Sequence, residues 1–121
     1  MDKTRLDRLL LAWPGTRAEV KWGNDWAYLV GERMFAVLGL GAPTDFSLSF
    51  KVDPDRFLEL TDRPGVIPAP YLARAHWVQL GAARALPAAE LRALLRTSYD
   101  LVAAKLPRRT RLALGIDPPA P

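Results

Sequence analysis

The sequence predicts an α+β fold: a single two-layer domain in which an antiparallel sheet of about five strands carries three helices packed on one face. Residues 47–52 alternate between polar and apolar side chains, which is typical of a strand with one buried and one wetter face. The turns between the expected strands are too short for the crossovers that parallel strands need. Residues 87–105 carry apolar side chains at helical spacing, which predicts a long amphipathic helix. Together these observations favour the element order α-β-β-β-β-α-β-α.

The first half of the chain contains one expected helix and four expected strands. The helix covers residues 4–13, where leucines recur at helical spacing, and it ends at Pro14-Gly15. Short turns containing glycine, and a loop over residues 39–45, separate the strands. The expected strands cover residues 19–22, 26–30, 33–38 and 47–52.

The second half contains two expected helices and one expected strand. Asp53 and Pro54 are a favoured N-cap and first helical residue, so a helix is predicted from there to about residue 62. Residues 66–74 contain two prolines, which argue against both helix and regular strand. A strand is predicted over residues 76–80 and a helix over 87–105. We therefore expect a domain over residues 1–115, followed by a frayed, proline-rich tail over residues 116–121.

Composition excludes several classes of function. The chain has 121 residues, half of them apolar and none of them cysteine, so we expect a globular domain without disulfides or thiolate chemistry. It has no apolar run of the ~20 residues that a membrane helix needs and no signal-peptide core at its charged N-terminus, which predicts a cytoplasmic protein that does not enter a membrane. His76 is the only histidine, and no acidic residue lies between Asp62 and Glu90. We therefore expect no metal, no cofactor and no enzymatic activity, because no nucleophile with a spaced base is present either.

The basic residues are unevenly distributed. The net charge is +4, and residues 63–121 hold nine basic and three acidic side chains. A basic half suggests contact with a polyanion such as nucleic acid. The abundance of Arg, Ala, Leu and Pro also fits the codon composition of a GC-rich genome, so this charge has a second explanation. Arg108, Arg109 and Arg111 form a small basic cluster after the last expected helix.

Aromatic residues on the expected strands suggest a second kind of site. Trp26 and Tyr28 share one strand face, and Lys21, Lys51 and Gln79 occupy strand positions that could reach the open face of the sheet. An open sheet face with aromatic and cationic side chains can stack bases and hold phosphates. Strand aromatics are also common in cores, where they form cross-strand pairs.

Several motifs occur in an order that resembles the MmcQ/YjbR family of small bacterial proteins. The motifs are WPGT at 13–16, KWG at 21–23, MFAV at 34–37, FKVDP at 50–54, PGVIPAPYL at 64–72 and HWV at 76–78. The resemblance extends over residues 6–105. It implies a compact CyaY-like fold with an antiparallel sheet, also similar to secretion chaperones. Members are commonly labelled DNA-binding because this fold resembles a double-wing DNA-binding motif, and the family supplies no catalytic residues to carry over.

The sequence and the resemblance together predict a DNA-binding protein that acts through non-catalytic phosphate contacts. Arg74, Arg108, Arg109 and Arg111 are expected on one exposed face with Lys21 or Lys51. The alternative is a protein-interaction or small-ligand-binding domain that uses the open sheet face. The proline-rich segment before Trp77 could line a pocket in either case. The residues predicted for nucleic-acid or ligand binding are Lys21, Lys51, Tyr71, Arg74, His76, Arg108, Arg109 and Arg111.

Overall fold

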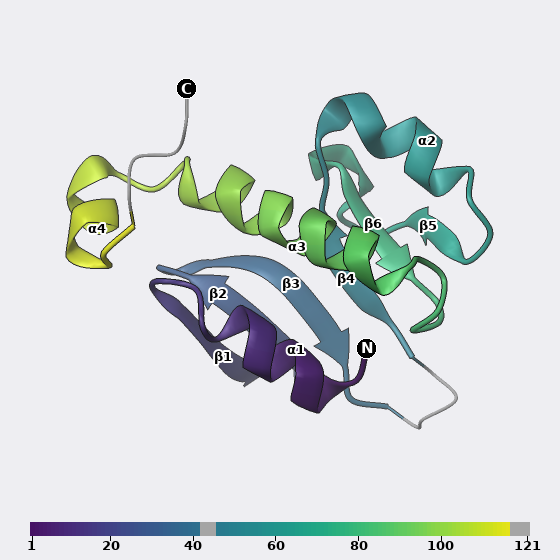
Figure 1. Cartoon of the computed structure of the whole chain (residues 1–121), viewed down its shortest axis with the longest axis horizontal. Coiled ribbons are helices and arrows are strands. Elements are labelled where there is room, and N and C mark those ends of the chain that lie inside the picture. Colours follow the sequence, from purple (N-terminus) through teal and green to yellow (C-terminus); the bar gives the residue numbers. More distant parts are fainter. Residues whose placement is uncertain (42–45, 117–121) are drawn as a thin grey trace.

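A six-stranded antiparallel sheet in the order β1-β2-β3-β4-β6-β5 forms the framework of the protein (Figure 1). The structure is a computed structural model, and it describes residues 1–41 and 46–116. The α+β fold class is confirmed, with one more strand and one more α-helix than predicted. The strands are β1 (Thr16–Lys21), β2 (Asp25–Val30), β3 (Arg33–Gly39), β4 (Leu48–Lys51), β5 (Val66–Pro68) and β6 (Trp77–Leu80), and the helices are α1 (Lys3–Leu10), α2 (Phe57–Thr61), α3 (Ala88–Ala103) and α4 (Arg108–Ala113).

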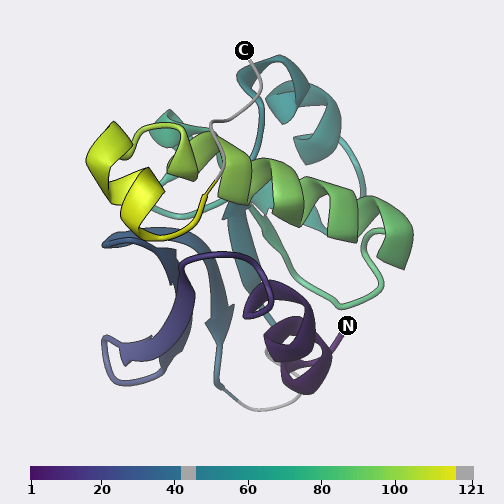
Figure 2. The same ribbon diagram turned by 60° about the vertical axis from the view of Figure 1, so that its left-hand side comes forward.

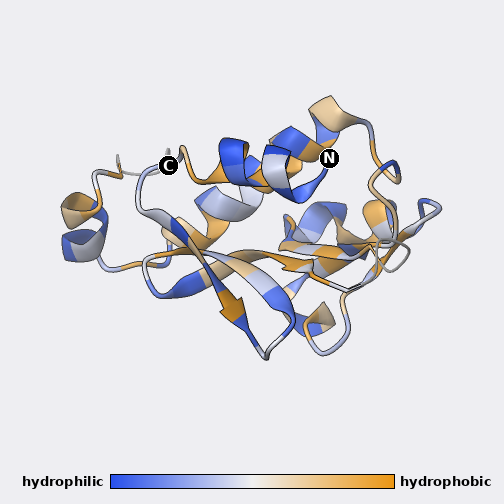
Figure 3. Cartoon of the chain, turned by 90° about the horizontal axis from the view of Figure 1, so that it is seen from below, coloured by the Kyte–Doolittle hydropathy of each residue, from blue (hydrophilic) through white to orange (hydrophobic). Residues whose placement is uncertain are grey.

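The helices α1 and α3 lie on the same face of the sheet (Figures 1 and 3). The long helix α3 crosses the middle strands, α1 lies below its N-terminal half and α4 lies beyond its C-terminal end (Figure 2). The opposite face of the sheet carries no α-helix of the described residues. No helix in the described part of the chain is long and apolar enough to span a membrane.

The alternation predicted for residues 47–52 is confirmed, and it shows that the core lies between β4 and the helices. Leu48, Phe50 and Val52 are fully buried on the helical side of β4, and they join the same apolar cluster as the stripe of α3. That stripe contains Leu91, Leu95 and Val102, as predicted from their helical spacing. Ser49 and Lys51 consequently lie on the opposite, open face of the sheet.

A β-bulge in β3 is bridged by a serine from α3. Tyr28 pairs with Ala36 and Leu29 with Met34, so Phe35 is one extra residue in β3, and its ring is buried against Trp13 and Tyr99. The buried hydroxyl of Ser98 donates to the carbonyl of Phe35 at 2.6 Å and accepts from the amide of Lys51 at 3.0 Å. One hydroxyl thus joins Phe35 of β3 to Lys51 of β4, one position beyond the last pair of the β3–β4 ladder, which is Ala36 with Phe50.

Asp7 of α1 fixes the aromatic residues of β2 on the helical side. Its Oδ1 accepts from Trp26 Nε1 at 2.9 Å and from Tyr28 OH at 2.7 Å, and its Oδ2 accepts from Lys3 Nζ at 2.8 Å. Burial raises the pKa of Asp7, but the hydrogen bonds from these donors outweigh burial and hold the pKa below its ordinary value. Trp26 and Tyr28 thus share one face of β2, as predicted, and of the two alternatives left open for them the structure shows the helical side, where Asp7 supplies an acceptor for both.

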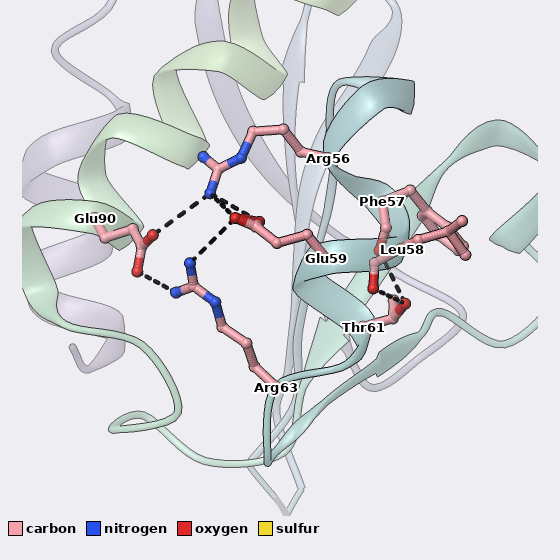
Figure 4. Close-up of polar contacts among 7 residues, drawn as sticks. All are labelled: Arg56, Phe57, Leu58, Glu59, Thr61, Arg63 and Glu90. Atoms are coloured by element: carbon pink, nitrogen blue, oxygen red, sulfur yellow. Dashed lines mark hydrogen bonds and ion pairs between the residues drawn. The ribbon is translucent and has the colours of Figure 1, made fainter.

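Four charged side chains join α2 to the N-terminal turn of α3 (Figure 4). Arg63 Nη1 contacts Glu90 Oε1 at 2.5 Å, and Arg56 Nη2 lies 3.6 Å from the other oxygen of Glu90. Both arginines also contact Glu59. These two cations therefore have partners within the protein and serve its architecture.

Two regular elements were not predicted. Val66–Pro68 forms β5, which pairs with β6 despite Pro68, because an edge strand tolerates a residue without an amide hydrogen. Arg108–Ala113 forms α4, which is too short to show a helical apolar pattern. Ile116, the first residue of the tail that was predicted to be frayed, is buried with the core, so the domain extends at least to this residue. The rest of the predicted tail, and residues 42–45 of the expected loop, lie outside the described residues.

Candidate functional site

A groove of about 510 Å³ lies on the open face of the sheet. Its floor is formed by strand residues such as Val37, Ser49 and Gln79, and the loop between β5 and β6 (residues 69–76) borders it. Trp22, from the turn between β1 and β2, and Tyr71, from the β5–β6 loop, line the same groove. We call this hollow the aromatic groove. Its lining residues are Trp22, Asp25, Met34, Val37, Ser47, Ser49, Ala69, Pro70, Tyr71, Leu72 and Gln79.

Both aromatic residues occupy turn positions that usually hold glycine or asparagine. Leu72 donates its amide to the carbonyl of Ala69, so residues 69–72 form a β-turn with Pro70 in its second position and Tyr71, at φ +66°, in its third. A positive φ at that position defines the type II turn, where glycine is preferred. Trp22 has φ +51° and precedes Gly23 in the β1–β2 hairpin. A left-handed backbone costs a side-chain-bearing residue about 1–2 kcal/mol.

The two aromatic side chains are also unusually exposed. Trp22 is 71% exposed, and Tyr71 is as exposed as in a free peptide. Burial in the core therefore does not offset the free-energy cost of the left-handed backbone at either residue. Strained residues of this kind are concentrated at binding and catalytic sites, so the turns point to a role for both rings in recognition.

A second hollow, of about 200 Å³, adjoins the aromatic groove and is lined by three cations. Arg33, Lys51 and Lys105 surround it, and Met34 lines both hollows. No carboxylate lines it among the described residues. Burial, and the nearby charge of Lys105, lower the pKa of Lys51. We call this hollow the basic hollow, and its uncompensated charge favours an anion.

Three of the predicted site residues lie around these two hollows. Lys51 lines the basic hollow, and its Nζ donates to the carbonyl of Ala75 at 2.6 Å. Arg74, which is exposed and has no ion pair among the described residues, immediately precedes that carbonyl. Tyr71 lines the adjoining aromatic groove.

Two other predicted residues have internal partners instead. Lys21 forms an ion pair with Glu19 at 3.2 Å on the β1 edge of the sheet. His76 has φ +61°, and its ring contacts the ring of Phe57 edge to face, with centroids 5.6 Å apart. These contacts give both residues a structural explanation.

The predicted arginine cluster is divided by its position on α4. Arg108 and Arg109 are exposed, and Arg108 borders a small hollow together with Arg111. Arg111, in contrast, donates Nη1 to the carbonyl of Leu106 at 2.6 Å and to that of Ala104 at 3.4 Å. It therefore satisfies carbonyl groups at the C-terminal end of α3. Arg111 thus has a structural role that Arg108 and Arg109 do not show among the described residues, and phosphate binding by the cluster stays a prediction.

Sequence reasoning missed Trp22, Arg33 and Lys105 as site residues. Lys105 lies at the end of the helix predicted over residues 87–105, and Arg33 lies at the start of a predicted strand. Only the fold brings these two residues beside Lys51. The signal available for Trp22 was its place before Gly23 in a tight turn, where a large aromatic residue is unusual.

A third hollow, of about 620 Å³, lies between α1 and α3. It is lined by Arg5, Arg8 and Arg92 together with Met1, Leu9 and Ala88. None of these arginines forms an ion pair with a described residue. Elsewhere, no group of three or more histidine and acidic side chains that could hold a metal occurs within residues 1–41 and 46–116.

The fold and these surfaces define a small α+β domain with an aromatic groove on its open sheet face and, adjoining it, a basic hollow that residues at the C-terminal end of α3 also line. The chain belongs to the YjbR family, whose profile matches residues 11–101. No curated protein matches the chain.

Two solved structures support the fold. The Deinococcus radiodurans protein DR2400, with a domain described as DUF419, is similar with a TM-score of 0.85 and 29% identity over 97% of this chain and 90% of that one. A protein from Pseudomonas syringae has a TM-score of 0.67 and 19% identity over 84% of this chain and 98% of its own, and this likeness concerns the fold alone.

Proposed function

We propose that the protein binds DNA without catalysis, through contacts between its basic hollow and the phosphate backbone. The observation that carries the proposal is the convergence of Arg33, Lys51 and Lys105 on one hollow that no described carboxylate lines. Phosphate contacts dominate the affinity of proteins for nucleic acid, and cations whose charge no neighbouring carboxylate neutralises are suited to supply them.

Neighbouring cations extend this surface in two directions. Arg74 lies beside the carbonyl that Lys51 contacts. Arg108 and Arg109 follow Lys105 closely in the chain, and α4 is held to the end of α3 by Arg111. A backbone that occupies the basic hollow therefore has further cations within reach. Phosphate contacts fix position without reading sequence, so we expect binding with little base preference from this surface.

The salt dependence of duplex DNA binding tests the proposal. In the triple variant Arg33→Gln/Lys51→Gln/Lys105→Gln, the slope of log affinity against log salt should become shallower by roughly three, because each phosphate contact contributes about 0.9 on duplex DNA. Fluorescence anisotropy of a labelled duplex at several salt concentrations measures this slope.

A second triple variant provides a matched control. Arg5→Gln/Arg8→Gln/Arg92→Gln removes the same charge from the hollow between α1 and α3, which lies outside the proposed surface. This control should keep a slope close to that of the unmodified protein. Equal slopes in the two variants would mean that net charge, and not the basic hollow, governs binding. Undetectable binding of the unmodified protein at ~50 mM salt, where non-specific attraction is strong, would also overturn the proposal.

A further inference from the structure

We infer that the aromatic groove binds an unpaired base, so that the protein prefers single-stranded DNA to duplex. The base stacks on Trp22 and Tyr71, and the adjoining phosphate lies in the basic hollow. The phosphate contact rests on the function proposed above, whereas the base contact rests on the groove itself.

The groove has the surfaces that a flat heterocycle requires. Two exposed aromatic rings line it, together with apolar side chains that include Val37, Ala69 and Leu72. Its volume of about 510 Å³ falls in the range of small-molecule sites, so it has room for a single base. Stacking of a base on an aromatic side chain is tolerant of sequence, because every base presents a π-face.

Polar groups at the floor of the groove suit the edge of a base. Ser49 donates its hydroxyl to Gln79 Oε1 at 3.4 Å, which leaves the amide nitrogen of Gln79 as a donor. Asp25 and Ser47 add acceptors elsewhere in the same groove. A neutral ring with both donors and acceptors on its edge is therefore a better match than a purely apolar ligand.

The two hollows are arranged along the strands in a way that separates base from phosphate. Ser49 and Lys51 are two residues apart on the same face of β4, so they lie about 6–7 Å apart along the strand. Ser49 lines the aromatic groove and Lys51 lines the basic hollow. The carboxylate of Asp25 lies at the other end, since its strand position pairs with Gly39 and not with Met34. Lys51 and the carboxylate of Asp25 are thus at opposite ends of the open face.

A base inside a duplex is stacked and paired, so it cannot enter the groove without the cost of being extruded. Single-stranded DNA presents its bases without that cost. This difference predicts a preference for single strands that duplex phosphate binding alone does not produce.

Three labelled probes of equal length separate the contribution of base stacking from that of phosphate contact. They are oligo(dT), an abasic strand with the same phosphates, and a duplex. The unmodified protein should bind oligo(dT) at least 5-fold more tightly than the abasic strand, which corresponds to about 1 kcal/mol or more of stacking. Tyr71→Asn and Trp22→Asn should each reduce this ratio towards one, because asparagine adopts a left-handed backbone readily and keeps the turn while removing the ring.

Affinity for the duplex and for the abasic strand should be unchanged in both variants. The control Leu58→Ala removes an equally exposed apolar side chain from α2, away from the groove, and should leave all three affinities as they are. Equal affinity of the unmodified protein for oligo(dT) and the abasic strand would overturn this inference while leaving the proposed phosphate contact intact. Absence of binding to all three probes would instead overturn the proposed function.

Discussion

Two residues, Trp22 and Tyr71, hold a left-handed backbone with an aromatic side chain attached. The turn at residues 69–72 would form more readily with glycine in the place of Tyr71, because a Cβ atom is unfavourable at φ +66°. The exposed ring contributes no burial to offset this cost. The turn at Tyr71 is therefore less stable than the same turn with glycine, and its exposed ring lines the aromatic groove.

We predict that Tyr71→Gly stabilises the protein. Relief of the left-handed tyrosine should raise the free energy of unfolding by up to about 1 kcal/mol, since glycine adopts this conformation without strain. Urea unfolding followed by circular dichroism measures the change. A matched substitution, Leu58→Gly, lies on helix α2 and should destabilise the protein instead. A loss of stability in Tyr71→Gly would show that the ring makes contacts that stabilise the fold.

At the scale of elements, the connection between α3 and the sheet depends on more than apolar packing. The hydroxyl of Ser98 lies between β3 and β4 at the end of their paired segment and satisfies one backbone donor and one backbone acceptor. Lys51, whose amide is that donor, also carries its side chain into the basic hollow. The serine therefore couples the position of α3 to a residue of the candidate site.

Ser98→Ala should lower the free energy of unfolding by about 1–3 kcal/mol, because it leaves a buried amide and a buried carbonyl unpaired. Thermal or urea denaturation measures this loss. Thr97→Ala on the same helix serves as the comparison, since Thr97 is only partly buried and forms no side-chain hydrogen bond with a described residue. Similar losses in both variants would contradict a specific role for the bridging hydroxyl.

The elements that could be predicted from the sequence are those whose signal is local. Alternation in residues 47–52 and the apolar stripe of α3 each depend on a short period, and both placed their buried faces correctly. The face of β2 could not be predicted in this way, because Trp26 and Tyr28 are directed by Asp7, which lies about twenty residues away in the sequence. Nor could β5, because Pro68 at a sheet edge resembles a strand breaker.

The candidate site was predicted only in part for a similar reason. Tyr71 and Arg74 could be identified from their residue types in the proline-rich segment, and Lys51 from a strand position that could reach the open face of the sheet. Their neighbours Arg33 and Lys105 come from the start of β3 and the end of α3, and only the packing of α3 on the sheet brings them together. A basic hollow assembled from three separate elements has no continuous motif in the sequence.

For the whole molecule, the carboxylate of Asp7 links stability to pH. Its pKa is lowered from the ordinary value of 3.8 in the folded state, so its hydrogen bonds stabilise the fold above that value. This stabilisation is lost as the pH falls through the folded pKa. The residue joins α1 to β2, so its protonation weakens the attachment of the N-terminal helix to the sheet.

Asp7→Asn should therefore cost about 1–3 kcal/mol near pH 7, where the carboxylate receives charge-assisted hydrogen bonds. The difference from the unmodified protein should shrink as the pH falls below 3.8. Urea denaturation over a series of pH values measures both effects. Asp62→Asn, an exposed residue after α2, should show little change at any pH. A difference in the free energy of unfolding between Asp7→Asn and the unmodified protein that stays constant at every pH would contradict the link between Asp7 ionisation and stability.

The two edges of the sheet differ in how they would meet another chain. At one edge, β5 is three residues long and includes Pro68, which has no amide hydrogen to offer. At the other edge, β1 alternates charges at Arg17, Glu19 and Lys21. Two copies of β1 pairing antiparallel about Glu19 would place like charges opposite one another, which is unfavourable. Pairing with a strand of another chain is therefore unfavourable at both edges, and we expect the protein to remain unaggregated at high concentration.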